Sequence, residues 1–231
     1  MSLYTLAFRE DAGPSCRFGP EERLVVAAEL MATIGAVDGD ALIALPAGYA
    51  VAASLDEREG WAEGLAAASR NAGVGVVFGL DVDDAVRWGM ERCLRSFVYA
   101  IDRGRRLLWG TPPTTRASAL GARTVTFGAL RTTLLFGREL FEARAVATVE
   151  KARPDLVVVL GHGAPTRKWL PQLAAVDDVA PTLVVHQQLE VRRPVAVPPP
   201  RGWRPTVSRG PVRVVSYRRE ADGAAACVVG N

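Results

Sequence analysis

The strongest restriction on the fold comes from a run of five aliphatic residues, Leu156-Val157-Val158-Val159-Leu160, which is followed by Gly161. Such a run indicates a β-strand, and because no polar residue alternates with the apolar ones, both faces of that strand are expected to be buried. Residues 139–153 before the run and 169–176 after it have apolar side chains at helical spacing. A buried strand between two helices is typical of a sheet with crossover connections.

The same alternation of strand-like and helix-like segments continues along the chain. Further strands are expected at residues 3–8, 41–45, 75–80, 95–101, 106–109, 123–127, 131–136 and 182–186, and further helices at 20–34 and 57–71. The Asp102-Arg103-Gly104 sequence lies between two of these strands and predicts a hairpin turn. The pattern therefore predicts an α/β fold.

The composition is that of a folded globular protein, with 49% hydrophobic and 23% charged residues among 231. A net charge of +3 is too small to indicate a nucleic-acid partner. Every uncharged apolar stretch is shorter than the roughly 18–20 residues that span a bilayer, so no membrane partner is expected. The three cysteines, Cys16, Cys93 and Cys227, lie far apart, which favours a cytoplasmic location and predicts neither a disulfide framework nor a metal site. No cofactor-binding motif is present, so no cofactor is expected.

The C-terminal part of the chain is rich in proline, with six prolines from Pro194 to Pro211. Such a segment is expected to be extended and to stay out of any central strand. Beyond it, residues 212–217 and 224–229 are expected to form a terminal hairpin. The sequence thus predicts one domain over residues 1–193 and a C-terminal arm over 194–231, which either packs on its own domain or is exchanged with a partner subunit.

An ordered set of five segments resembles the nitrilase superfamily of carbon–nitrogen hydrolases. The segments are Leu42-Ile43-Ala44-Leu45-Pro46-Ala47-Gly48-Tyr49, residues 66–79, residues 97–108, residues 131–142, and residues 155–161 followed by Trp169. The resemblance implies a single-domain, four-layer α-β-β-α sandwich. It also implies a homodimer paired through helices, for which residues 139–153, with Leu140, Phe141, Val146 and Val149, are the candidate interface.

The residues that the family uses for catalysis are missing from the matching positions. The family has a glutamate base, a lysine and a nucleophilic cysteine. This sequence has Ala47 at the glutamate position and Gly137 at the cysteine position, or Phe136 if the register is shifted by one residue. The first lysine of the chain is Lys151, and Arg116 is the cation nearest to the lysine position. Alanine and glycine offer neither a base nor a nucleophile, so the family's acyl-enzyme mechanism is expected to be absent.

Polar residues nevertheless gather where ligands bind in an α/β fold, beyond the carboxyl ends of the strands. The candidate pocket residues are Tyr49, Arg116, Arg138, Glu139, His162 and His186. For each there is a structural alternative, such as packing for Tyr49 or a favourable carboxylate at a helix start for Glu139. The first hypothesis for function is a catalytically degenerate, binding, scaffold or regulatory subunit, with a small amide- or carboxylate-bearing ligand. The alternative is a hydrolase of carbon–nitrogen bonds with a site rebuilt around Glu139 and His162.

Overall fold

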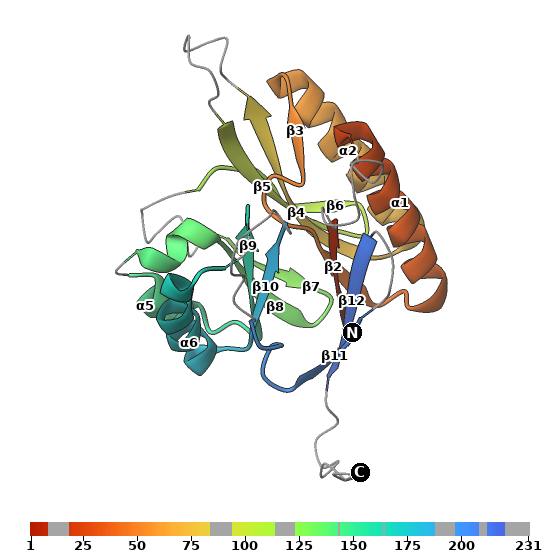
Figure 1. Cartoon of the computed structure of the whole chain (residues 1–231). Helices are drawn as coiled ribbons and strands as arrows, with labels where there is room; N and C mark the ends of the chain where they lie inside the picture. The colour runs from red at the N-terminus through yellow and green to blue at the C-terminus, as the bar shows by residue number, and fades with distance from the viewer. Residues whose placement is uncertain are drawn as a thin grey trace.

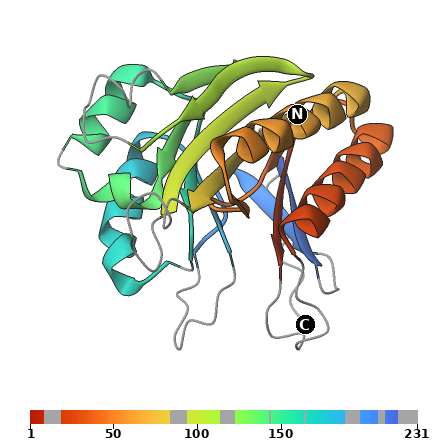
Figure 2. The same cartoon turned by 90° about the horizontal axis from the view of Figure 1, so that it is seen from above.

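The computed structural model contains two β-sheets that face each other, with a pair of helices on the outer face of each sheet (Figures 1 and 2). It describes residues 1–8, 19–83, 94–113, 123–142, 144–163, 165–187, 197–207 and 212–219. These four layers confirm the predicted α-β-β-α sandwich. None of the helices in these ranges is long and apolar enough to cross a membrane.

The first sheet has the strand order β11-β12-β1-β2-β4-β5-β6, with β3 paired to β4. Its strands are β1 (Ser2–Phe8), β2 (Ala41–Ala44), β3 (Ala50–Ala52), β4 (Gly75–Asp83), β5 (Leu94–Asp102), β6 (Arg105–Thr111), β11 (Trp203–Val207) and β12 (Val212–Arg219). Strands β1, β2 and β4 run parallel to one another, while β4, β5 and β6 form an antiparallel meander. Helices α1 (Pro20–Val37) and α2 (Leu55–Ala72) cover the outer face.

The second sheet has the strand order β10-β9-β8-β7. Its strands are β7 (Thr124–Phe127), β8 (Leu130–Phe136), β9 (Leu156–Gly161) and β10 (Thr182–His186). Strands β8, β9 and β10 are parallel, and their connections contain the 3-10 helices η3 (Gly137–Phe141) and η4 (Arg167–Trp169) and the helices α5 (Ala145–Ala152) and α6 (Leu170–Val179). Helices α5 and α6 cover the outer face of this sheet (Figure 2).

Strand β9 shows why its sequence is uniformly apolar. Leu156, Val158 and Leu160 belong to the core between the two sheets, whereas Val157 and Val159 belong to the core beneath α5 and α6. All of them are fully buried. Strand β4 is divided in the same way between the inter-sheet core and the core beneath α1 and α2. Both sheets therefore have two buried faces, which is what a four-layer sandwich requires.

The helix expected at residues 139–153 is wrong in its first part. The chain instead forms the short 3-10 helix η3, becomes extended at Glu142, and begins α5 only at Ala145. The reason is a buried ion pair: the Glu139 carboxylate binds Arg123 and the backbone N–H of Phe136, which holds the turn tight after β8. The spacing of apolar residues within 139–153 could not predict this ion pair, because Arg123 lies outside that segment.

The C-terminal strands also differ from the expectation. Residues 203–207 and 212–219 pair with each other as β11 and β12, and β12 pairs with β1 of the same chain, so this part of the expected arm completes the first sheet. Pro205 lies in β11, at the edge of the sheet, where a missing N–H is tolerated. Residues 224–229, the other half of the expected hairpin, lie outside the described residues.

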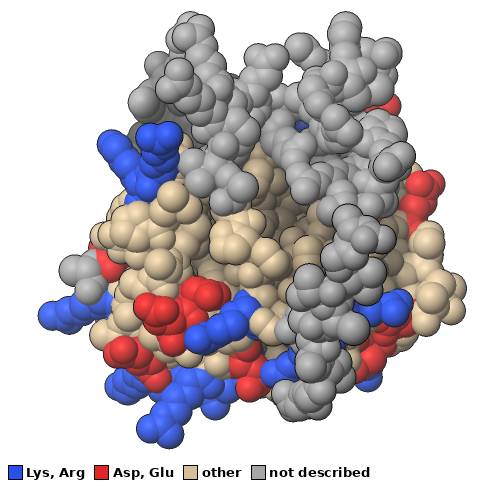
Figure 3. Space-filling model, turned by 60° about the horizontal axis from the view of Figure 1, so that its bottom comes forward, with Lys and Arg blue, Asp and Glu red and all other residues tan. Residues whose placement is uncertain are grey.

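On the face in Figure 3, basic and acidic side chains are interspersed where charges are coloured.

Candidate functional site

The candidate site lies where the carboxyl ends of parallel strands from both sheets meet. A cleft of about 260 Å³ opens there, lined by Ser96, Phe136, Gly137, Arg138, His162, Gly163 and Trp169. Gly137 follows β8 and His162 follows β9, so the carboxyl ends of two neighbouring parallel strands supply one wall. Ser96 comes from β5 of the opposite sheet. The topology thus brings residues that are distant in sequence into one cleft.

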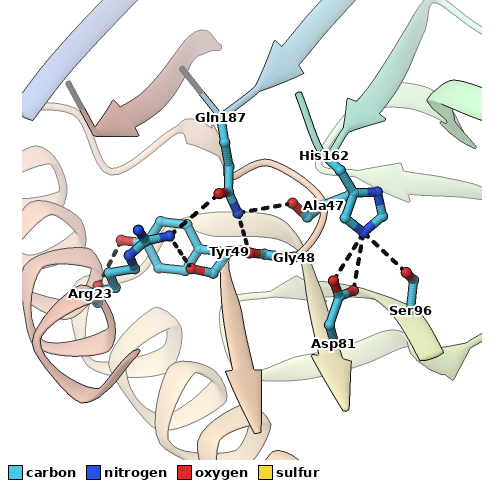
Figure 4. Close-up of polar contacts among 8 residues, drawn as sticks. All are labelled: Arg23, Ala47, Gly48, Tyr49, Asp81, Ser96, His162 and Gln187. Carbon is cyan, nitrogen blue, oxygen red and sulfur yellow. Dashed lines mark hydrogen bonds and ion pairs between the residues drawn. The ribbon is translucent and has the colours of Figure 1, made fainter. Parts of the chain in front are cut away.

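A His-Asp-Ser cluster is the chemical centre of this cleft (Figure 4). His162 Nε2 lies 3.0 Å and 3.2 Å from the two carboxylate oxygens of Asp81, and 3.0 Å from Ser96 Oγ. Asp81 is 1% exposed, whereas the His162 side chain is 48% exposed. The imidazole therefore joins a buried carboxylate to the open cleft.

The cluster differs from a linear Ser-His-Asp triad because the carboxylate and the hydroxyl share one ring nitrogen. An ionised carboxylate can only accept hydrogen bonds, so Asp81 favours a proton on Nε2 of His162. The second ring nitrogen, Nδ1, lies on the other side of the ring from Asp81 and Ser96 (Figure 4). In this tautomer Nδ1 is the basic nitrogen, and Asp81 stabilises the imidazolium that forms when Nδ1 takes up a proton.

Of the three residues, His162 was predicted from the sequence, whereas Asp81 and Ser96 were not. Asp81 had a detectable signal, because it is a carboxylate inside the otherwise buried and mainly apolar strand β4. Ser96 had none, since a single serine in a strand is ordinary. Neither residue is close to His162 in the sequence, and only the packing of the two sheets brings the three together.

Gly137, which the sequence resemblance assigns to the family's cysteine position, lies against an aromatic ring. A Cβ atom built on Gly137 would lie 2.1 Å from Cη2 of Trp169, far inside van der Waals contact. Trp169 stands at the start of α6 and lines the cleft with its indole. Glycine at 137 is therefore matched to tryptophan at 169, and the ring occupies the space that a nucleophilic side chain would need.

Ala47, which the sequence resemblance assigns to the family's glutamate position, belongs to a turn held by hydrogen bonds. Ala47 is fully buried, and its carbonyl accepts a hydrogen bond from Gln187, which follows β10 (Figure 4). Of the two roles predicted for Tyr49, packing is the one observed: it is fully buried in the core under α1 and α2, and its hydroxyl donates to the carbonyl of Arg23. Burial raises the pKa of Tyr49 well above its usual range, so the hydroxyl stays a neutral donor.

Glu139 does not line the cleft, contrary to the expectation that it belongs to a rebuilt catalytic site. Its two carboxylate oxygens lie 2.6 Å and 2.8 Å from the guanidinium nitrogens of Arg123, and both side chains are almost completely buried. The carboxylate is thus occupied in holding η3 against β8. Its role in the structure is to fix the segment that carries Gly137.

Of the three remaining candidate pocket residues, Arg138, His186 and Arg116, one lines the cleft. Arg138 lines the cleft and is exposed. His186 ends β10 and is not part of the cleft lining; its Nδ1 lies 3.0 Å from the carbonyl oxygen of Gln187. Arg116 lies outside the described residues. Within the ranges that the structure describes, no three His, Cys, Asp or Glu side chains are grouped so that they could hold a metal ion.

A side chain at position 48 is expected to destabilise the protein, because Gly48 lies close to Asp81 and His162 of the cluster. Its φ angle is +58°, and a Cβ there would lie 2.6 Å from Asp81 Oδ2 and 2.9 Å from His162 Cδ2. Gly73 provides a matched control, since its φ is +70° but its Cβ would meet open space. We expect Gly48→Ala to lower the free energy of unfolding by about 1–3 kcal/mol more than Gly73→Ala, measured by urea denaturation. Equal losses in the two variants would contradict the close contact.

Comparison with known proteins finds similar folds among solved structures. No model of a protein family matches the sequence, and no curated protein matches it. Among solved structures, the NitN amidase from Nesterenkonia sp. AN1 has a TM-score of 0.59 at 15% identity, covering 93% of this chain and 92% of the amidase. A carbon–nitrogen hydrolase from Helicobacter pylori G27 has a TM-score of 0.55 at 7% identity, covering 81% and 73%.

The chain therefore has the fold of the nitrilase-superfamily amidases and carbon–nitrogen hydrolases, as the resemblance implied. Structures of the Nesterenkonia amidase include one with acrylamide added at its active-site cysteine and one in complex with butyramide. In the present chain, the position that resembles the family's cysteine is Gly137.

Proposed function

We propose that this protein hydrolyses a carbon–nitrogen bond in a small amide- or carboxylate-bearing molecule, with His162 as the general base and Asp81 as the residue that orients it. The observation that carries the proposal is the 3.0 Å contact between His162 and the buried Asp81 at the wall of the cleft. The likeness to amidases supports hydrolysis over a purely non-catalytic role. As part of the same proposal, the reaction takes place in the cytoplasm.

The proposed reaction needs no covalent intermediate. His162 Nδ1 removes a proton from a water molecule as the water oxygen attacks the carbonyl carbon, and the imidazolium that forms is stabilised by Asp81. The proton then passes to the leaving nitrogen as the carbon–nitrogen bond breaks, so that an amide and water give a carboxylic acid and ammonia. The Arg138 guanidinium, which lines the cleft, is the donor proposed for the developing oxyanion, whereas the Ser96 hydroxyl lies on the Nε2 side of the ring and helps to hold it.

The test is ammonia release from a panel of simple amides, nitriles and N-carbamoyl compounds, butyramide included. We expect His162→Gln to lower turnover by about 10²–10⁴-fold, because the general base is lost. His186→Gln is the matched control: it removes the other histidine of the chain, which does not line the cleft, and should leave turnover close to wild type. Turnover that survives in His162→Gln would overturn the proposal.

Ser96→Ala separates this mechanism from a covalent one. If the hydroxyl only helps to hold the imidazole, its removal should slow turnover less than removal of the base. If Ser96→Ala is as inactive as His162→Gln, and a serine-bound acyl group is detected by mass spectrometry, Ser96 is the nucleophile and the direct attack of water is wrong.

A second candidate is a ligand-binding, scaffold or regulatory subunit without catalysis. It is favoured by Gly137, whose side-chain space Trp169 fills, and by Ala47 at the position of the family's glutamate. A folded wild-type protein that binds butyramide in ligand-observed NMR, yet releases no ammonia from the panel, would establish this candidate in place of the first.

The homodimer stays a prediction. Of the four apolar residues expected at its interface, Leu140 and Val149 are buried within this chain and Val146 packs against the same core. Phe141 is 48% exposed, on a 3-10 helix rather than on the expected continuous helix. A dimer formed on this side of the molecule would therefore use Phe141 rather than the buried residues.

A further inference from the structure

Two neighbouring side chains of the second sheet reach across to the first sheet at the cleft. In the parallel pairing of β9 and β10, His186 is opposite Gly161, so the next residues along each strand, Gln187 and His162, leave the sheet side by side. His162 contacts Asp81 and Ser96, and Gln187 contacts the turn that follows β2 (Figure 4). The two sheets are thus joined at this edge by a pair of polar contacts.

Both ends of the Gln187 carboxamide are engaged. Its nitrogen donates to the carbonyl of Ala47 at 3.2 Å and, more closely, to the carbonyl of Gly48. The Gln187 oxygen lies 3.5 Å from Nη1 of Arg23. Nη1 of Arg23 also donates to the carbonyl of Tyr49, at 3.2 Å. An amide can serve two carbonyl acceptors and one cationic donor at once, whereas a carboxylate would face the carbonyl oxygens with no proton to offer.

The turn held in this way is the one that presses on the catalytic pair. Gly48 is so close to Asp81 Oδ2 and His162 Cδ2 that even one added carbon atom would collide with both. Any displacement of the turn therefore alters the space in which the carboxylate and the imidazole meet. Gln187 thus affects the Asp81–His162 pair indirectly: it binds the carbonyl of Gly48, and Gly48 lies next to both side chains.

We propose that Gln187 is a positioning residue, which sets the geometry and the tautomer of His162 by holding Gly48 against the Asp81–His162 pair. What the pair does chemically rests on the proposed function, but its geometry does not. Gln187 does not touch the reacting atoms in this proposal. It acts through the backbone of the turn.

The direct test is the ¹⁵N spectrum of the imidazole rings, since the chain has two histidines and His186→Gln assigns them. At a pH where both rings are neutral, we expect His162 in the wild-type protein to be protonated at Nε2. Gln187→Met keeps the approximate size of the side chain but loses its donors, and Gln187→Glu replaces the donors with oxygen. Both variants should lose this single-tautomer signature and give averaged His162 shifts.

The matched control is Gln172→Met, which makes the same chemical change on α6. It should leave the His162 shifts unchanged, and thermal unfolding of all variants separates a local effect from a loss of fold. If turnover is detected, kcat should fall by about 10²-fold in Gln187→Met with little change in KM, because the base is misplaced rather than the binding surface lost. Wild-type His162 shifts in a folded Gln187→Met protein would overturn the proposal. Absence of turnover in the wild-type protein would instead count against the proposed function, and the spectra would still decide the role of Gln187.

Discussion

Replacing Glu139 with alanine is expected to lower the free energy of unfolding by about 3–5 kcal/mol, because it leaves the buried cation of Arg123 without its partner. Arg123 is fully buried and Glu139 is 1% exposed, so water does not screen either charge. The same change removes the acceptor for the backbone N–H of Phe136, 2.8 Å away. The carbonyl of Pro112, which also accepts from Arg123, does not neutralise the charge.

Urea denaturation of Glu139→Ala measures this loss. Glu150→Ala, at an exposed position on α5, removes a carboxylate without burying a charge and should change stability by less than about 0.5 kcal/mol. The double variant Arg123→Met/Glu139→Met removes both charges together and should be more stable than Glu139→Ala. A loss in Glu139→Ala as small as that in Glu150→Ala would mean that the ion pair is unimportant for the fold.

Placing a cysteine at Gly137, the position that the sequence resemblance assigns to the family's nucleophile, is expected to damage the protein rather than to activate it. In Gly137→Cys the new Cβ would lie 2.1 Å from Cη2 and 2.7 Å from Cζ2 of Trp169, so the indole must move or the strand end must shift. Overpacking of this kind lowers stability by about 1–3 kcal/mol. The absence of a side chain at Gly137 and the position of the Trp169 ring are thus sterically linked.

A double-mutant cycle checks the pairing. Trp169→Ala removes the ring, so Gly137→Cys should be less destabilising in the Trp169→Ala background than in the wild-type protein, by 1 kcal/mol or more in the cycle. Gly64→Cys is the control, because a Cβ at this helical position meets nothing within 4 Å. Additive losses across the cycle would show that the ring and the glycine do not depend on each other.

Elements whose local residue pattern reflects their burial could be predicted from the sequence alone. The aliphatic run of β9 is apolar at every position because one set of its side chains faces α5 and α6 and the other faces the first sheet. The position of His162 followed from the same run, since the residue comes directly after the end of the strand. Patterns of this kind are local, and a local pattern can be read without knowing the partner.

The errors concern residues whose partners are distant in the chain. Glu139 looked like an acidic residue at the start of a helix, but its carboxylate is bound by Arg123 from the segment before β7. Tyr49 follows a strand end, which made it a candidate for the mouth of a pocket, but its ring packs in the core, as its structural alternative predicted. Ser96 carries no signal in sequence, because it becomes part of a site only when the two sheets face each other.

The pairing of β1 with β12 has a consequence for the synthesis of the protein. Strand β1 lies between β2 and β12, so a strand that is synthesised early is completed by one that is synthesised much later. Until residues 212–219 emerge, one edge of β1 has no hydrogen-bonding partner, and an unpaired edge invites association with other chains. Contacts of such long sequence separation form slowly, because the chain must first close a large loop. The nascent chain therefore depends on β12, or on a chaperone in its place, to keep β1 from pairing wrongly.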